Sequence, residues 1–209
     1  MVIEKVKSGK TVSESLVLAK ALEIGCCNWP EEYPEAPKVE VRCVYTGNEL
    51  FLRFDVEEKC TAALVDRDNG DVWTDSCVEF FVTFGTAGYY NIEANCIGRL
   101  LMSHRLSKTD GVEMATPEVL AAIKRNPSLG RETFSERLGD NRWSLDLAIP
   151  VSSFFKDDLK DFSGVECRAN FYKCGDNLSL PHFLSWKRIE TTYPDFHRPE
   201  FFGSLKFED

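Results

Sequence analysis

The sequence lacks the features that mark several large classes of protein. It has no run of about 18 apolar residues, the length that a membrane-spanning helix needs. It contains no internal repeat, low-complexity tract or long linker, and neither a G-x-S-x-G nucleophile motif nor a glycine-rich phosphate loop is present. These absences argue against a protein that spans a membrane with helices, a hydrolase with a nucleophile elbow and a P-loop enzyme.

Histidine is scarce, and cysteines in metal-binding spacing are lacking. The chain has three histidines, far apart in the sequence, and its eight cysteines include no C-x-x-C pair. This argues against a structural zinc site, which usually uses such pairs. Cys43, Cys96 and Cys167 fall in strand-like runs beside apolar neighbours, so we expect most of the cysteines to be reduced, buried thiols. Reduced thiols favour a cytoplasmic location.

Positive charge is also in short supply, because 25 Lys and Arg oppose 34 Asp and Glu, a net charge of −9. An acidic protein is a poor partner for nucleic acid or for an anionic membrane surface. Near the N-terminus the apolar run 16–22 is broken by Lys20, so we expect a helix or strand of the mature protein and no signal peptide in this chain. A secreted or periplasmic location would require a signal that had already been removed. Nothing in the sequence indicates the oligomeric state.

What the sequence does have is many short runs of strand-forming residues. We expect strands at about 39–45, 49–57, 61–66, 71–84, 88–97, 99–104, 131–137, 142–149, 165–174, 182–188 and 203–208. The Asn69-Gly70 pair between two of these runs predicts a hairpin. Many short strands with few helices predict an all-β fold, an antiparallel β-sandwich formed by residues 1–209 as a single domain.

Helical signals are few. Thr116 before Pro117 and Glu118 predicts an N-cap and a short helix in the run that follows. A turn or two of helix is also expected within 151–160. The segment 105–140, with its helix and polar loops, is predicted to depart from the sandwich and could roof one of its faces.

Several of the expected strands have two contrasting faces, because side chains on a strand alternate. In the run 72–84, Val78, Phe80 and Val82 form an apolar face typical of a core. The opposite face carries aromatic, carboxylate, amide and guanidinium groups: Trp73, Asp75 and Glu79 in this run, Tyr89, Asn91, Glu93 and Asn95 in the next, and Arg168 and Asn170 in a later one. Such groups suit a sugar, because aromatic rings pack on its C–H faces and planar polar groups bond its hydroxyls. The same amides and guanidinium could instead hold covering loops.

Five spaced motifs, VWTDSCVEFF, YYNIEANCIG, RANFYKCGD, FLSW and PDFHRPEFFG, resemble those of carbohydrate-binding module family 9-like proteins. The resemblance runs from about Asn28 to the C-terminus with the motifs in the same order. It implies a jelly-roll β-sandwich related to the DOMON-like domains. It also implies binding to the ends of plant polysaccharides and their oligosaccharides, frequent attachment to xylanases in polysaccharide catabolism, and bound calcium.

The resemblance also implies roles for particular residues. Two aromatic rings would clamp a terminal sugar, one from Trp73 and one from Phe196, with His197 beside it. The remaining matched positions would bond hydroxyl groups or line the site: Glu79, Asn91, Glu93, Asn95, Arg168, Asn170 and Trp186. Two of these positions differ from the characterised binder, which carries Arg in place of Glu93 and Trp in place of Phe196. By contrast, we expect Trp29 and Trp143 to lie in the core.

Two other functions stay open. A glycoside hydrolase needs two carboxyl groups about 5–9.5 Å apart. Asp75 and Glu79, four residues apart on a strand, would be about 13 Å apart, but Glu79 and Glu93 on neighbouring strands could lie closer. The other alternative is a protein-interaction sandwich whose aromatic face meets another chain. We favour non-catalytic binding, for which no cofactor is required.

One turn is rich in acidic residues. Asp66, Asp68 and Asp71 supply carboxylates within a single loop, as calcium prefers, although no glutamate stands at the twelfth position where an EF-hand loop has one. The sequence therefore allows a structural calcium site at Asp66, Asp68 and Asp71, with a solvated turn as the alternative.

Overall fold

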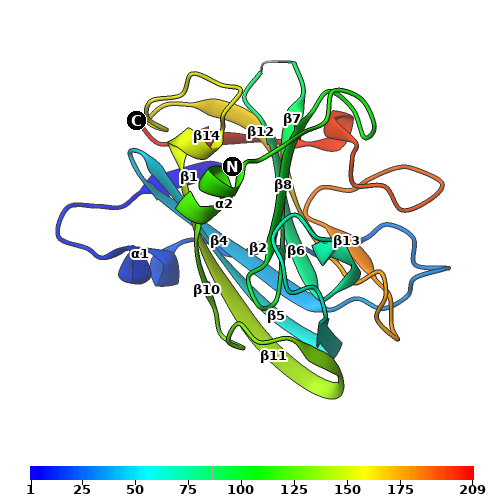
Figure 1. Ribbon diagram of the computed structural model, residues 1–209. Helices are drawn as coiled ribbons and strands as arrows, with labels where there is room; N and C mark the ends of the chain where they lie inside the picture. Colours follow the sequence, from blue (N-terminus) through cyan, green and yellow to red (C-terminus); the bar gives the residue numbers. More distant parts are fainter. Residues whose placement is uncertain (86) are drawn as a thin grey trace.

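The structure, a computed structural model, describes residues 1–85 and 87–209 and is built mainly from strands. The strands hydrogen bond into one strongly curled sheet whose two halves pack face to face (Figure 1). In the first half the order is β10 (Lys124–Pro127), β11 (Phe134–Pro150), β5 (Glu49–Ala63) and β4 (Lys38–Thr46), with β2 (Leu22–Glu23) also on β4. In the second half the order is β14 (Gly203–Phe207), β12 (Glu166–Cys174), β6 (Cys77–Thr83), β7 (Tyr89–Asn95), β8 (Leu100–Arg105) and β9 (Glu113–Met114), with β13 (Phe183–Ser185) on β12 and β3 (Cys26–Cys27) on β13.

Strand β1 (Val2–Lys5) joins the two halves. Val2 and Ile3 pair with β14, whereas Glu4 and Lys5 pair with β4, and both pairings are parallel. The other strand pairings among the described residues are antiparallel, so the predicted antiparallel β-sandwich is confirmed apart from this one strand. The sequence analysis missed β1, whose four residues are too few to show a clear alternation.

The first half contains two strands that are longer than predicted. Residues 49–57 and 61–66 were expected to be separate strands, but Glu49–Ala63 is a single strand. Its partner β11 likewise unites the runs 131–137 and 142–149. The pairing of β5 with β11 continues past the polar residues between the apolar runs, with register shifts between Phe134 and Arg137 and between Leu138 and Asn141. These polar residues therefore do not end either strand.

The start of β6 also differs from the prediction. The strand begins at Cys77, and Val72–Thr74 form a 3-10 turn, η1, before it. The prediction of a hairpin at Asn69-Gly70 is wrong, because β5 and β6 belong to different halves of the sheet. Asn69 does have the positive φ that such turns need, 54°, but its turn carries the chain from one half to the other.

The core lies between the two halves. Val78, Phe80 and Val82 of β6 point into it, as predicted, together with Tyr90, Ile92 and Ala94 of β7. Phe171 of β12 stacks on Phe80 with ring centroids 5.0 Å apart, and meets Phe54 from the opposite half at 6.4 Å. Trp143 is also buried in this core, as expected.

The core also holds a buried ion pair. Lys173 of β12 and Glu58 of β5 lie 2.8 Å apart, and both side chains are fully buried. The Trp143 indole N–H donates to the Glu58 carboxylate over 2.6 Å, and the Lys173 amine lies 2.7 Å from the His182 ring. This pair ties the two halves together by charge as well as by apolar packing.

The outer face of the second half carries a separate apolar cluster. Phe81, Tyr89 and Tyr172 of the strands pack there against Trp29, which is buried as predicted, and against Phe196. The strands of this half are therefore covered on both faces. Loops from the C-terminal third of the chain supply much of the outer cover.

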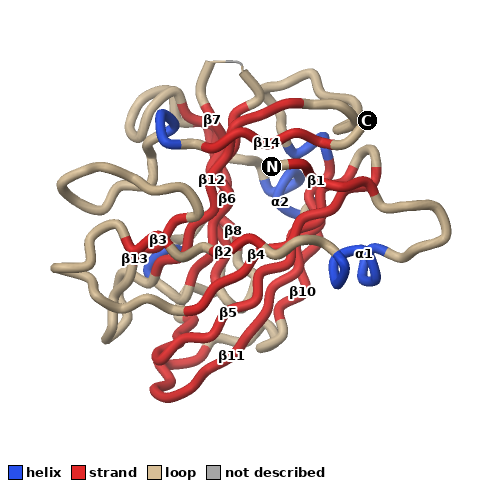
Figure 2. Tube along the Cα trace, turned by 180° about the vertical axis from the view of Figure 1, so that it is seen from behind, coloured by secondary structure: helices blue, strands red, loops and turns tan. Residues whose placement is uncertain are grey.

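Two short helices lie outside the sheet. Helix α1 (Val12–Leu18) begins with a capping box between Thr11 and Glu14, and α2 (Pro117–Ala122) has the predicted Thr116 cap and leading proline. Single 3-10 turns, η2 (Val151–Ser153) and η3 (Pro199–Phe201), follow β11 and precede β14. Figures 1 and 2 place α1 and the loops around β13 on opposite sides of the molecule.

No helix in the described chain is long and apolar enough to cross a membrane. All eight cysteines are free thiols, and six of them are buried.

Candidate functional site

A cavity of about 370 Å³ opens on the outer face of the second half of the sheet. Strands β6, β7, β8 and β12 supply its floor with Glu79, Glu93, Leu101, Arg105 and Cys174. The walls come from η1, from the start of β13 and from loops, and they comprise Trp73, Lys108, Thr109, Asp176, Phe183 and residues 194–197. Five of the predicted site residues meet here: Trp73, Glu79, Glu93, Phe196 and His197.

Trp73 is the most accessible aromatic side chain of this cavity. It is 38% exposed, and it stands on η1 and not on the strand where the sequence analysis placed it. The segment 105–140 does not bury it: β10 pairs with β11 in the other half, and α2 contacts η2. Of this segment only Arg105, Lys108 and Thr109 reach the cavity. An exposed indole beside polar groups is suited to stacking on a ring.

Phe196 lines the same cavity but is only 8% exposed. Its ring stacks on Tyr172 with centroids 4.3 Å apart and planes within 9° of parallel. Trp29 and Phe183 pack around it at 6.4 and 6.2 Å. Phe196 is therefore a fixed wall, with much less free surface than Trp73.

The floor contains two carboxyl groups. Glu79 on β6 and Glu93 on β7 are register partners in neighbouring strands, and they are 3% and 4% exposed. One oxygen of Glu93 accepts from the Asn91 amide over 2.8 Å. Its other oxygen, Oε2, is buried without a hydrogen-bond partner among the described residues. Glu79 accepts from the Cys174 thiol over 3.1 Å.

Their environment disfavours ionisation of both groups. Burial, followed by the charge of Glu93, raises the pKa of Glu79 well above its usual value. Burial raises the pKa of Glu93 to about 7, although Asn91 and Arg105 act in the opposite direction. Burial also raises the pKa of Asp176 at the cavity wall to about 6. Protonated carboxyl groups at neutral pH would give the floor hydrogen-bond donors as well as acceptors.

The rim carries positive charge. Arg105 donates to the Asn91 and Ser103 side chains over 3.0 and 2.8 Å, and Lys108 pairs with Asp195 at 3.1 Å. The ring of His197 lies 2.9 Å from the Tyr89 hydroxyl. Burial lowers the pKa of His197 to about 4, so this ring is neutral at pH 7.

Five predicted residues do not line this cavity. Asn91 lies behind Glu93 and Arg105 and positions both of them. Asn95 is saturated by Asp75, the Val65 carbonyl and the Arg99 amide. Asp75, left without a role by the sequence, also caps the amides of residues 64 and 65.

The other three hold the C-terminal loops. The Asn170 amide donates to the Lys187 carbonyl and accepts from its N–H. Arg168 donates to the carbonyl of Phe202, and it lines a different cavity near the N-terminus. Trp186 packs against Phe171 and under the Lys187 amine. Amide and guanidinium groups on a sheet face thus serve loop attachment here, which was the alternative to ligand binding.

The acidic turn has other partners. Both oxygens of Asp68 contact one nitrogen of Arg125, at 2.7 and 2.8 Å, and Asp68 also accepts from the Leu100 amide. Within the described residues, Asp66, Asp68 and Asp71 do not form a group of three candidate metal ligands. Among the described residues, Asp68 is the one of the three whose carboxylate has protein partners.

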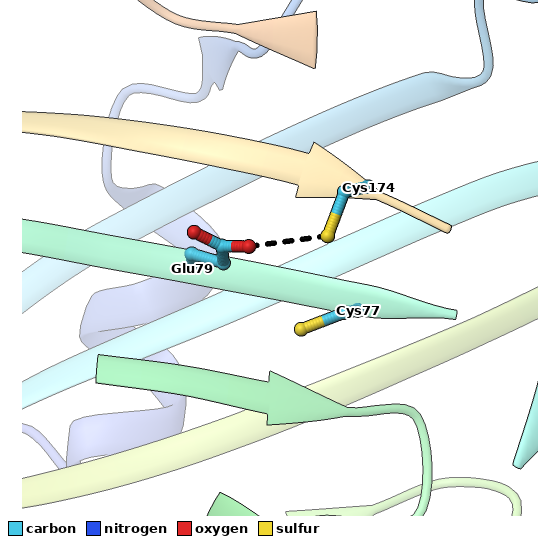
Figure 3. A group of neighbouring side chains, drawn as sticks. All are labelled: Cys77, Glu79 and Cys174. Atoms are coloured by element: carbon cyan, nitrogen blue, oxygen red, sulfur yellow. Dashed lines mark hydrogen bonds between the residues drawn. The ribbon is translucent and has the colours of Figure 1, made fainter. Parts of the chain in front are cut away.

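One cluster was missed by the sequence analysis. Figure 3 shows Cys77, Glu79 and Cys174 gathered on neighbouring strands, with the Cys174 thiol directed at the carboxylate. Their ligand atoms all lie within 4.8 Å of one another. The two cysteines are 97 residues apart in sequence, and only the pairing of β6 with β12 brings them together. Also missed were Arg105, Lys108, Asp176 and Asp195 of the cavity wall, which come mostly from loops without alternation.

A half-exposed indole, buried carboxyl groups and charged rim residues around one cavity of a curled β-sandwich define a small-ligand-binding module. Comparison with known proteins gives its family. Residues 12–207 match the family described as carbohydrate-binding family 9. The chain belongs to this family.

Solved structures agree with this assignment. A protein from Bacteroides uniformis, named as a candidate carbohydrate-binding protein, has 41% sequence identity and a TM-score of 0.94, with 100% of this chain and 98% of that chain covered. Two structures of a family 9 carbohydrate-binding module from Caldicellulosiruptor kristjanssonii, one with glucose and one with cellotriose, have 11% identity and a TM-score of 0.58. They cover 100% of this chain and 95% and 94% of those chains, and they confirm the sandwich fold. No curated protein matches the chain.

Proposed function

We propose that the protein binds a carbohydrate, without catalysis, in the cavity beside Trp73. The observation that carries the proposal is the position of this half-exposed indole at the mouth of a cavity whose floor holds two buried carboxyl groups. The cavity volume of about 370 Å³ falls within the usual range for ligand sites. A sugar combines an apolar C–H face with hydroxyl groups and therefore needs both kinds of surface.

Each part of the cavity has a role in this proposal. Trp73 stacks on the sugar ring, and the narrow exposed edge of Phe196 limits the ring on another side. Glu79 and Glu93 bond hydroxyl groups from below, with Arg105 and His197 available at the side. The unpartnered oxygen of Glu93 would gain its hydrogen bond from the ligand, which removes the cost of burying it alone.

The proposed ligand is the end of a plant-type oligosaccharide or polysaccharide. A closed floor with a single exposed ring suits a chain end better than the middle of a long chain. The glucose and cellotriose complexes of the Caldicellulosiruptor module support this ligand class. No cofactor takes part in the binding. A calcium ion at Asp66 and Asp71 would have a structural role only, because these residues do not line the cavity.

A glycan array followed by calorimetry tests the proposal. Trp73→Ala is expected to weaken binding by roughly 1–3 kcal/mol, as the loss of a stacking aromatic typically does. Tyr193→Ala is a matched control, because Tyr193 is 71% exposed and does not line the cavity. Equal affinity for the wild type and Trp73→Ala, or no binding to any plant glycan, would contradict the proposal.

One observation favours a second function. Glu79 and Glu93 face each other on neighbouring strands, where side chains are about 4.5–5.5 Å apart at Cβ. Retaining glycosidases place their carboxyl groups about 5–5.5 Å apart. Turnover of an aryl glycoside that is lost in both Glu79→Gln and Glu93→Gln would establish a hydrolase. Binding without turnover supports the module.

A further inference from the structure

The cluster beneath the cavity has the chemistry of a metal site. Cys77 on β6 and Cys174 on β12 are register partners, and Glu79 lies two residues from Cys77 on the same face of β6. Their two sulfur atoms and one carboxylate oxygen lie within 4.8 Å of one another, with 3.1 Å between the Cys174 thiol and Glu79 (Figure 3). Two thiolates and a carboxylate are ligands that zinc and similar borderline-soft cations accept.

The ligand atoms need only small movements to meet one ion. Zinc lies about 2.3 Å from thiolate sulfur and about 2.0–2.2 Å from carboxylate oxygen. Ligands around a tetrahedral ion are therefore about 3.5–3.8 Å apart by simple geometry from those lengths. The present spread of up to 4.8 Å closes with side-chain rotation and a small shift of the strands. Register pairing already fixes the two cysteines side by side.

The site is accessible from one side only. Cys174 and Glu79 line the cavity, whereas Cys77 lies behind them and is fully buried. An ion would enter through the cavity and keep one coordination position open toward it. Glu93, opposite Glu79, has a buried oxygen without a partner among the described residues. That oxygen could accept a hydrogen bond from a water molecule bound to the ion.

The surrounding charge favours a cation. Four carboxyl groups line the cavity, from Glu79, Glu93, Asp176 and Asp195, against the two cationic side chains of Arg105 and Lys108. Of the cationic groups, Lys108 is already paired with Asp195. Lys173, on the core face of β12, is paired with Glu58. A divalent ion at the cluster would stabilise the ionised forms of these carboxyl groups, which burial otherwise disfavours.

We propose that Cys77, Cys174 and Glu79 form a binding site for a zinc-type divalent cation, open to the cavity at its fourth position. On binding, each thiol loses its proton to the solvent and forms a metal–sulfur bond, the Glu79 carboxyl group loses its proton where it is protonated and forms a metal–oxygen bond, and no oxidant or reductant takes part. This proposal does not depend on carbohydrate binding. The absence of C-x-x-C spacing does not weigh against it, because the two sulfur ligands come from paired strands.

Cobalt titration of the fully reduced protein tests the proposal, because Co²⁺ bound to thiolate gives an intense near-ultraviolet charge-transfer band. We expect one Co²⁺ per chain and displacement of the band by Zn²⁺. Calorimetry with buffers of different ionisation enthalpy should show release of two protons per ion from the thiols, and of a third where Glu79 is protonated. Because both thiols must lose their protons to bind the ion, the affinity should increase with pH.

Variants separate this site from other thiols. Cys174→Ala and Cys77→Ala should abolish the band, and Glu79→Gln should weaken Zn²⁺ binding by more than the roughly 10–100-fold that loss of an outer partner costs. Cys43→Ala, which removes a buried thiol of β4, should leave the band unchanged. No thiolate band in the wild type, or a band that persists in Cys174→Ala, would overturn the proposal. Thiol counting before each titration excludes a Cys77–Cys174 disulfide, and anomalous scattering from zinc-soaked crystals locates the ion even if one variant fails to fold.

Discussion

Glu79 and Glu93 lie opposite each other on β6 and β7, and each is less than 5% exposed. Burial raises the pKa of both carboxyl groups. For Glu79, repulsion from Glu93 adds to this effect, and for Glu93 the pKa rises to about 7 from an unfolded value near 4.5. The folded state thus binds protons that the unfolded state has already lost in this pH range. Because of these two groups, the free energy of unfolding decreases as the pH rises from about 4.5 through about 7.

Replacing either residue with glutamine should remove this pH-dependent cost. We expect Glu93→Gln to raise the free energy of unfolding relative to the wild type by up to about 3 kcal/mol at pH 8, since the pKa differs by about 2.5 units between the folded and unfolded states and each unit is about 1.4 kcal/mol. The difference should shrink toward pH 4.5, where the wild-type carboxyl groups are protonated. Urea unfolding of both proteins at several pH values measures it. A difference that is constant with pH would show that Glu93 ionises normally in the folded protein.

Removing one partner of the ion pair between Lys173 and Glu58 should reduce stability strongly. Burial acts to raise the pKa of Glu58, but Lys173 and its other partners outweigh it, and the net shift is downward. Lys173→Met leaves the Glu58 charge buried without its partner and should cost about 3–5 kcal/mol of unfolding free energy. The double variant Lys173→Met/Glu58→Gln should cost less than the sum of the single changes.

The exposed pair of Lys38 and Glu57, 3.4 Å apart, is the control for this experiment. Lys38→Met should change stability by about 1 kcal/mol or less. If Lys173→Met has an equally small effect, the buried pair is not an important link between the two halves of the sheet.

Asn170 should affect stability more than sugar affinity. Its amide makes two hydrogen bonds to the backbone of Lys187, and it does not line the cavity. The sugar affinity of Asn170→Ala, measured by calorimetry at a temperature where the variant is folded, should stay within a few-fold of the wild type. A lost affinity with unchanged stability would instead make Asn170 a ligand-binding residue.

The contrast between Glu79 and Trp73 shows which parts of the site are predictable from sequence. Alternation along β6 and β7 correctly separates the core face of Phe80 and Ile92 from the face of Glu79 and Glu93. This works because strand geometry fixes the direction of each side chain relative to its neighbours. Trp73 was assigned to the cavity through the family resemblance, although it stands on a 3-10 turn and not on the predicted strand.

Other parts depend on long-range pairing that a single sequence does not reveal. Cys77 and Cys174 meet only because β6 pairs with β12, and a one-residue register change would turn one of the two thiols to the other face. The continuity of β5 through its polar residues likewise depends on the pairing with β11. Asn95 and Asn170 were indistinguishable from ligand-binding amides, because their type and face are the same whether a sugar or a loop is bound.

The acidic turn gives a final prediction, in which Arg125 and calcium compete for Asp68. Arg125 places one nitrogen 2.7 and 2.8 Å from the two oxygens of Asp68 and also donates to the carbonyls of Gly98 and Leu120. It therefore joins the turn to the loop before β8 and to the end of α2. Arg125→Ala should cost about 1–3 kcal/mol of unfolding free energy, because it leaves these part-buried carbonyl groups without their donor. Because Arg125 already neutralises Asp68, the melting temperature of the wild type should be the same in calcium and in EDTA. A calcium-dependent increase that disappears in Asp66→Asn or Asp71→Asn would show that these carboxylates bind calcium beside the ion pair.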